Sequence, residues 1–157
     1  MRAFTEKTLL VATHNAGKLE EIRAMLAPHG IEVTSAGEKG LPEPDETETS
    51  FIGNARIKAR AAMLATGLPV LADDSGITVG GLDGAPGVYT ADWAETPNGR
   101  DFLQAMTRTW RDLDERGVPE PRNAQFRATL ILMWPDGHEE IFEGIAPGHL
   151  VWPPRGP

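Results

Sequence analysis

The chain has 157 residues, with 23 acidic and 15 basic side chains that give a formal net charge of −8. Its composition, 40% hydrophobic and 24% charged, is typical of a folded globular protein, and we predict one domain over residues 1–157. The negative charge argues against a nucleic-acid polymer as partner, and the lack of cysteine excludes disulfides, thiolate zinc sites and cysteine nucleophiles.

The first half of the chain predicts a strand, a helix and a second strand, followed by an acidic loop and another helix. Thr8 to Thr13 is a β-prone apolar run, helical spacing follows it, and residues 31–34 alternate as a strand. Residues 38–48, rich in Pro, Glu and Asp, predict a loop. Ser50 and Gly67 are placed to begin and end the next helix.

The middle of the chain predicts a buried strand that ends in a turn. Residues 68–72 form an apolar run that leads into Asp73-Asp74-Ser75-Gly76. We expect Gly76 to let the backbone turn sharply there, with a second short strand at residues 77–79 and a glycine- and proline-rich turn region at residues 80–87.

The last third predicts a long helix and a β-hairpin. Thr96-Pro97 is typical of a helix start, and the helix ends near Gly117. Its apolar stripe, predicted to face the core, consists of Phe102, Leu103, Met106, Trp110 and Leu113. Two strands, 126–134 and 139–143, flank a Pro-Asp-Gly turn, and residues 149–152 suggest one more strand.

No apolar run along the chain approaches the length of a membrane span, and the first seven residues lack a signal-peptide core. We therefore expect a cytoplasmic protein without a membrane partner.

The first candidate site is the loop between the first strand and the first helix. It consists of Thr13, His14, Asn15, Ala16, Gly17 and Lys18. Backbone amides at a helix N-terminus favour an anion, and a lysine there can reach a phosphate. The spacing is not that of a Walker A loop, and a Gly-Lys pair at such a turn is often only structural.

The second candidate site is the pair Asp73 and Asp74, with a contribution from the acidic loop. Two adjacent carboxylates repel each other, a cost that a divalent cation would relieve, and carboxylate oxygens suit Mg²⁺. A solvated turn is the alternative at this tetrapeptide. The loop acids Glu43, Asp45, Glu46 and Glu48 would matter only if one of them shares a metal ion with Asp74, since charge runs are usually solvated surface.

Four segments, taken in order and spacing, resemble the ITPase family of nucleoside triphosphate pyrophosphatases. They are THNAGK at 13–18, ETETSFIGNARIKA at 46–59, LADDSG at 71–76 and GAPGVYTADWA at 84–94. The resemblance extends from about Leu9 to Gly156. It implies hydrolysis of nonstandard purine nucleoside triphosphates (ITP, dITP and XTP) to the monophosphate and pyrophosphate, with Mg²⁺ as cofactor and a homodimer as the assembly.

The resemblance also assigns roles to individual residues. The phosphate loop falls on Thr13 to Lys18, the metal-binding glutamate on Glu46, and the catalytic, metal-binding aspartate on Asp74. Substrate contacts fall on Ser75, Asn54 and Lys58. Two positions depart from the family pattern: Gly53 stands where a glutamate is usual, and the family's C-terminal GFGYDP segment and Ser-His-Arg have no match. We therefore expect a domain that is C-terminally truncated relative to the family.

The resemblance implies an α/β fold, with a mixed twisted β-sheet, flanking helices and a β-rich second lobe, and a nucleotide cleft between. The main hypothesis is a Mg²⁺-dependent pyrophosphatase acting on nonstandard purine nucleotides. Two alternatives stay open: a catalytically impaired nucleotide-binding fragment of that family, and an unselective triphosphate phosphohydrolase.

Overall fold

The computed structural model describes residues 2–154, so the end of the family resemblance at Gly156 lies outside the described residues. Five strands form one sheet in the order β2-β1-β3-β6-β7, and β4 and β5 form a two-stranded sheet. The strands are β1 (Thr8–Val11), β2 (Glu32–Ser35), β3 (Val70–Val79), β4 (Glu95–Thr96), β5 (Gly99–Arg100), β6 (Arg122–Met133) and β7 (Glu139–Leu150). The α-helices are α1 (Ala16–Leu26), α2 (Phe51–Thr66) and α3 (Phe102–Glu115), and short 3-10 turns lie at Ala27–His29, Gly80–Leu82, Gly87–Tyr89 and Asp92–Ala94.

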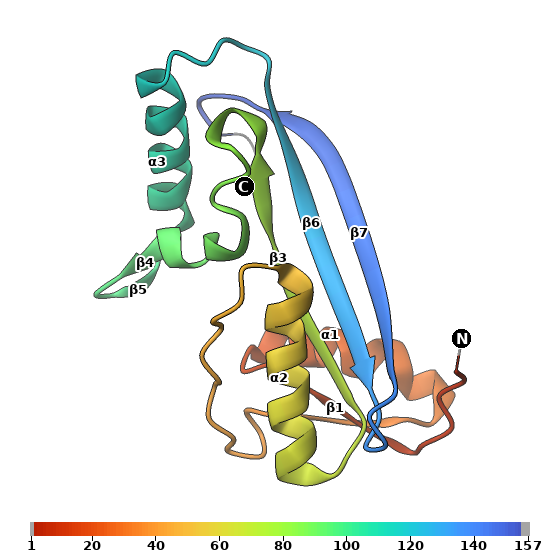
Figure 1. Cartoon of the computed structure of the whole chain (residues 1–157). Helices are drawn as coiled ribbons and strands as arrows, with labels where there is room; N and C mark the ends of the chain where they lie inside the picture. The colour runs from red at the N-terminus through yellow and green to blue at the C-terminus, as the bar shows by residue number, and fades with distance from the viewer. Residues whose placement is uncertain (1, 155–157) are drawn as a thin grey trace. The chain divides into compact units, whose positions relative to one another are not determined.

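The sheet is mixed, as predicted. Strand β1 pairs in parallel with both β2 and β3. Figure 1 draws β6 running opposite to β3 and β7, as expected of two neighbouring strands, β6 and β7, joined by a short turn. The prediction of an α/β fold with a mixed sheet and flanking helices is confirmed.

The chain divides into two compact units, and the three long strands contribute to both. The first unit comprises residues up to Asp74 with Thr129–Glu143, and the second comprises Ser75–Ala128 with residues from Gly144 on. Whether the whole chain folds as one domain stays a prediction.

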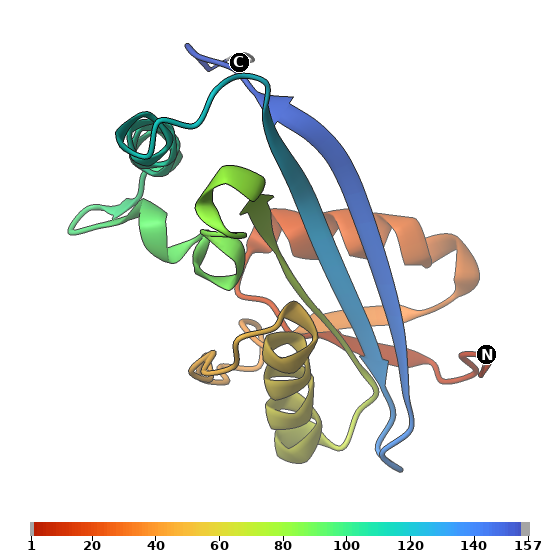
Figure 2. The same cartoon turned by 45° about the horizontal axis from the view of Figure 1, so that its top comes forward.

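In the first unit, alternate residues of β1 serve two separate cores. Leu10 packs with the alanines of α2, whereas Val11 packs with Leu19 of α1. Because successive strand residues point to opposite faces, α2 and α1 cover opposite sides of these strands (Figure 1, Figure 2). Helix α1 begins directly after the end of β1, in the loop that carries the first predicted site.

Local capping explains the bounds of α2, as the sequence predicted. The Ser50 side chain accepts a hydrogen bond from the Gly53 amide at 3.0 Å, and Gly67 ends the helix in the left-handed region with φ of 69°. On its outer side, Arg56 forms a two-pronged ion pair with Glu139 of β7, 2.7 Å at its shorter contact. That hydrogen bonding holds the pKa of the Glu139 carboxyl below its usual range.

The predicted turn at residues 73–76 is wrong, because β3 continues through it as one extended strand. Its buried positions include Val70, Ala72, Asp74 and Gly76, the period-two pattern of a strand between neighbours. Strand β1 pairs with β3 at Val70 and Leu71, before this segment, and β6 is the sheet neighbour of β3 on the other side. We attribute the extended backbone to pairing in the sheet, which outweighs the local turn preference of Asp, Ser and Gly.

In the second unit, the predicted helix start at Thr96-Pro97 is also wrong. Thr96 belongs to the β4–β5 hairpin, where Gly99 has φ of 107°, and α3 begins after Asp101. The Asp101 carboxylate caps the helix by accepting from the Leu103 and Gln104 amides. The Asn-Gly pair at 98–99 is the hairpin signal that the Thr-Pro pair obscured.

The apolar stripe predicted along α3 is largely wrong. Phe102, Leu103 and Met106 are 52%, 55% and 43% exposed. The buried face of α3 consists of Ala105, Thr109 and Leu113, and Leu113 packs in the core of the second unit. The helix does end as predicted, next to Gly117 in the left-handed region.

The β6–β7 hairpin is confirmed, with a longer second strand than predicted. The turn is closed by the Gly137 amide, which donates to the Trp134 carbonyl at 2.9 Å. The two strands predicted at 139–143 and 149–152 are one strand, β7. Strand β7 is at the edge of the described sheet, the position in which a proline such as Pro147 is tolerated within a strand.

Candidate functional site

The phosphate loop, residues 13–18, joins β1 to α1 as the sequence predicted. The Asn15 amide donates to the Thr13 hydroxyl at 3.1 Å, and the Asn15 side chain caps α1 by accepting from the Lys18 amide at 3.0 Å. The amides of Ala16 and Gly17 are the first two of the helix and have no preceding helical turn to bond. These amides and the positive end of the helix dipole make the loop suitable for an anion.

Lys18 is held by an acidic side chain of the sheet. Its Nζ lies 2.5 Å from Oδ2 of Asp73, and the two side chains are 40% and 21% exposed. The pair joins the phosphate loop to β3, across 55 positions of sequence.

The two adjacent aspartates of β3 point in opposite directions. Because β3 is extended, Asp74 shares a face with Val70 and Ala72, which pack against α2, whereas Asp73 lies on the other face. Asp74 is 9% exposed. The sequence-based expectation was that one of the two carboxylates faces a ligand, and it stays a prediction.

Asn54 of α2 binds the acidic loop instead of facing outward. It is 1% exposed, and its side-chain oxygen accepts from the Glu48 amide at 2.9 Å, while its side-chain nitrogen donates to the Glu48 carbonyl at 3.3 Å. This reciprocal pair fixes the end of the loop two residues after Glu46.

The second lysine of the predicted site is also paired with a carboxylate. Lys58 lies one helical turn after Asn54 on α2, and its Nζ is 3.0 Å from Oε1 of Glu46. The structure therefore brings Glu46 and Lys58 together, as two predicted site residues.

The His14 ring connects the phosphate loop to the acidic loop. Its Nε2 lies 2.8 Å from the Leu41 carbonyl oxygen, and its Nδ1 lies 3.2 Å from Oε1 of Glu43. The nitrogen that faces a carbonyl must carry a proton to form the bond. The ring thus faces the acidic loop, and the predicted contact of His14 with substrate stays a prediction.

Gly53 occupies the third position of α2, where a capping-box glutamate would reach back to the N-cap. A Cβ at this position would lie 2.8 Å from the Glu48 Cβ and Cγ and 2.9 Å from the Ser50 hydroxyl. The Glu48 side chain therefore fills the space that a side chain at position 53 would take.

The donor chemistry fits a magnesium ion that arrives with a phosphate ligand. Within residues 2–154, no group of three or more His, Asp or Glu side chains is arranged to hold a metal. Mg²⁺ usually takes one or two carboxylates and completes its shell with water and phosphate oxygens. Glu46 and Asp74 are two oxygen donors of that kind.

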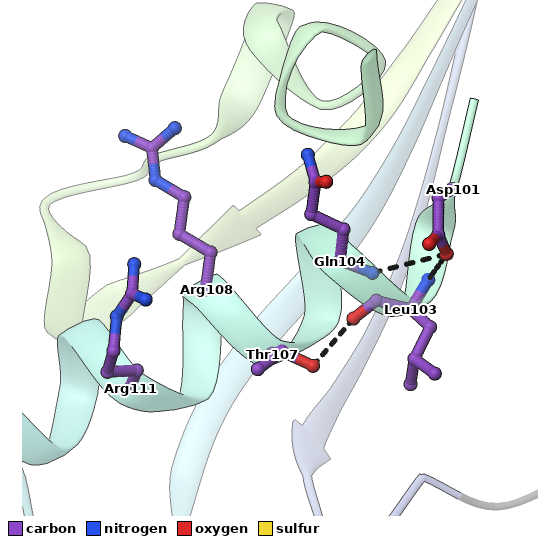
Figure 3. A pocket seen from close by; sticks show the side chains of 6 residues that line it. All are labelled: Asp101, Leu103, Gln104, Thr107, Arg108 and Arg111. Atoms are coloured by element: carbon purple, nitrogen blue, oxygen red, sulfur yellow. Dashed lines mark hydrogen bonds between the residues drawn. The ribbon is translucent and has the colours of Figure 1, made fainter. Parts of the chain in front are cut away.

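Ser75 is exposed and belongs to the second unit. That unit also carries an open concavity of about 450 Å³ on α3, away from every predicted site residue in sequence. Gln104, Arg108 and Arg111 extend from the same side of the helix there (Figure 3). Arg108 stacks on Trp93, with 3.8 Å from Cζ to the ring centroid.

Sequence reasoning missed Asp73 as the partner of Lys18 and Glu48 as the neighbour of Gly53. Neither contact leaves a local pattern. The alternation of buried residues along β3, which separates Asp73 from Asp74, is a feature of the structure, because residues 70–74 show no alternation of apolar and polar side chains in the sequence.

Comparisons with known proteins agree with the resemblance found in the sequence. Residues 9–157 match the model of the Ham1 family. A dITP/XTP pyrophosphatase from Ruegeria pomeroyi is 68% identical over 155 residues, which cover 99% of this chain and 76% of that protein.

Two solved structures have the same fold. A HAM1 protein from Coxiella burnetii has a TM-score of 0.87 at 31% identity, over 96% of this chain and 76% of that one. A nucleoside-triphosphatase / dITP/XTP pyrophosphatase from Mycobacterium abscessus has a TM-score of 0.78 at 35% identity, over 95% of this chain and 77% of that one.

The fold and the site define an α/β protein with a mixed sheet. Its candidate site consists of the phosphate loop at the start of α1 and two lysine–carboxylate pairs, Lys18–Asp73 and Lys58–Glu46. The chain belongs to the Ham1 family. None of the helices within residues 2–154 has the length and apolar character needed to cross a membrane.

Proposed function

We propose that the chain is a nucleoside triphosphate pyrophosphatase that hydrolyses nonstandard purine nucleotides such as ITP, dITP and XTP. The observation that carries this proposal is the phosphate loop with Lys18 at the N-terminus of α1, close to a carboxylate of β3. The names of the relatives support the reaction and the substrate class. The proposed products are the nucleoside monophosphate and pyrophosphate.

The triphosphate binds to the phosphate loop in this proposal. The amides of Ala16 and Gly17 and the Lys18 ammonium supply the donors, while Thr13 and Asn15 hold the loop in shape. Lys58 supplies a second ammonium from α2. Ser75 contacts the substrate as the resemblance implies, whereas we assign Asn54 and His14 to holding the acidic loop.

Glu46 and Asp74 would hold the magnesium ion through their carboxylate oxygens. When bound, Mg²⁺ supplies positive charge that stabilises the charge developing on the leaving pyrophosphate. Asp74 also orients the attacking water and accepts its proton, for which a mostly buried carboxylate is well suited. The water oxygen forms a bond to the α-phosphorus, and the bond from that phosphorus to the bridging oxygen of the β-phosphate breaks.

The test is to incubate the purified chain with Mg²⁺ and ITP, XTP or ATP, and to quantify pyrophosphate against orthophosphate. We expect pyrophosphate from ITP and XTP but not from ATP, and none from an Asp74→Asn variant with the wild-type circular dichroism spectrum. Wild-type rates in that variant would refute the role of Asp74. Equal rates on ATP and ITP would favour an unselective phosphohydrolase, and binding of ITP without turnover would favour an impaired nucleotide-binding protein.

We also propose that the protein forms a homodimer in the cytoplasm. The cysteine-free sequence fits a reducing compartment. Light scattering coupled to size-exclusion chromatography tests the assembly: a mass near twice 17.0 kDa supports the dimer, and a mass near 17.0 kDa refutes it.

A further inference from the structure

Asp73 places a negative charge beside the loop that we propose binds phosphate. Its Oδ2 contacts the Lys18 ammonium at 2.5 Å, and its side chain is 21% exposed, so solvent screens the pair only in part. The pleat of β3 directs this carboxylate away from the face that carries Asp74. Asp73 is therefore a neighbour of the phosphate loop that the roles assigned so far leave unused.

The contact has a consequence for any anion that enters the loop. A phosphate that bonds to the Lys18 ammonium must take that donor from Asp73, or lie next to a like charge. Both alternatives cost binding free energy, because the Lys18–Asp73 attraction is lost or a phosphate–carboxylate repulsion is added. An Asp73 carboxylate is thus a competitor of the phosphate for the same cation.

Lys58 shows the same arrangement on α2. Its ammonium lies 3.0 Å from the Glu46 carboxylate, so each of the two lysines assigned to substrate phosphates already has a carboxylate partner. Within these two pairs, the positive and negative charges are balanced before a ligand arrives.

We propose that Asp73 is a positioning residue that holds Lys18 in the ligand-free protein and is displaced from it by the substrate's phosphates. The proposal rests on the proposed function and deepens it. Asp73 keeps Lys18 oriented at the loop and weakens the binding of bare polyphosphate anions. It therefore favours ligands whose phosphate charge is already partly neutralised by a divalent cation.

The test uses inorganic pyrophosphate as the probe, with binding measured by isothermal titration calorimetry in EDTA and again with Mg²⁺. Removal of one negative charge next to the anion predicts that Asp73→Asn binds metal-free pyrophosphate roughly three- to tenfold more tightly than the wild type. With Mg²⁺ present the gain is smaller. Asp73→Glu, which keeps the charge, restores weak binding.

Two further variants separate the exchange of partners from a general charge effect. Glu21→Gln removes an equal charge from an exposed position on α1 and leaves pyrophosphate affinity unchanged. In a Lys18→Met background, Asp73→Asn has roughly half its former effect or less, because the two residues act through one contact.

An Asp73→Asn variant that folds like the wild type and binds metal-free pyrophosphate equally or more weakly overturns the proposal. If the wild type still cleaves ITP, that result leaves the proposed function standing. A wild type that neither binds pyrophosphate nor cleaves ITP overturns both. Should Asp73→Asn fail to fold, Asp73→Ser takes its place with the same expected tightening.

Discussion

Asn54→Ala distinguishes a residue that holds the acidic loop from one that binds substrate. The substitution removes two hydrogen bonds to the Glu48 backbone, at 2.9 and 3.3 Å, from a side chain that is 1% exposed. Each such bond contributes about 0.5–1.5 kcal/mol, and alanine returns up to about 0.7 kcal/mol of helix propensity. Because the substitution also leaves the Glu48 amide without its partner, we expect a net loss of about 2 kcal/mol in the free energy of unfolding.

Thermal unfolding followed by circular dichroism measures this loss. For a chain of this size, about 2 kcal/mol corresponds to a fall in Tm of roughly 4–8 °C. The matched control is Asn98→Ala in the exposed β4–β5 turn, where no comparable change is expected. An Asn54→Ala protein that melts like the wild type, yet shows a sharply raised KM for ITP, would refute the loop-holding role and favour direct substrate contact.

Three further changes test contacts of the first unit. Glu139→Gln removes the ion pair with Arg56 and should cost about 1 kcal/mol of unfolding free energy at pH 7. The pKa of Glu139 is lowered in the folded state, so this stability is present above the pKa of the unfolded chain and is lost as the pH falls through the folded-state pKa. The free energies of unfolding of the wild type and Glu139→Gln, measured by denaturant titration, should therefore become equal in acid. A difference between them that persists in acid would contradict the role of the Glu139–Arg56 ion pair. Gly53→Ala should destabilise by about 1 kcal/mol in urea titrations, because the overpacking cost exceeds the helix-propensity gain, and a stabilised variant would show that the neighbouring side chains yield freely. His14→Phe removes the contacts of the ring with Leu41 and Glu43 and should speed up amide hydrogen exchange over residues 41–46. Unchanged exchange there would contradict the role of His14 in holding the acidic loop.

Sequence alone predicted the elements whose signals are local. Ser50 and Gly67 define α2 through hydrogen bonds within four residues, so their side-chain chemistry is sufficient. The Pro-Asp-Gly turn fixed the β6–β7 hairpin in the same way. The bounds of β3 were not predictable from its own residues, because its neighbours in the sheet, β1 and β6, come from distant parts of the chain.

In the candidate site, too, the parts with a local sequence signal were predicted and the contacts between distant residues were not. Thr13 to Lys18 was found from a strand, a permissive loop and a helix, all adjacent in sequence. The partner of Lys18 lies 55 residues away, and nothing near Lys18 indicates which acid it meets. Glu46 was separated from its acidic neighbours only by the family resemblance, and its contact with Lys58 at 3.0 Å is a physical difference between it and Glu43, which faces His14.

The two aspartates of β3 are chemically identical, but their positions in the strand place them on opposite faces. Both are carboxylates in one strand, yet the pleat assigns Asp74 to the face covered by α2 and Asp73 to the face of Lys18. The same isosteric change should therefore have opposite effects at the two positions. Asp74→Asn should abolish turnover, whereas Asp73→Asn should tighten metal-free pyrophosphate and retain turnover. If both variants lose turnover alike and neither binds pyrophosphate more tightly, the two carboxylates act as one unit and the division by face is wrong.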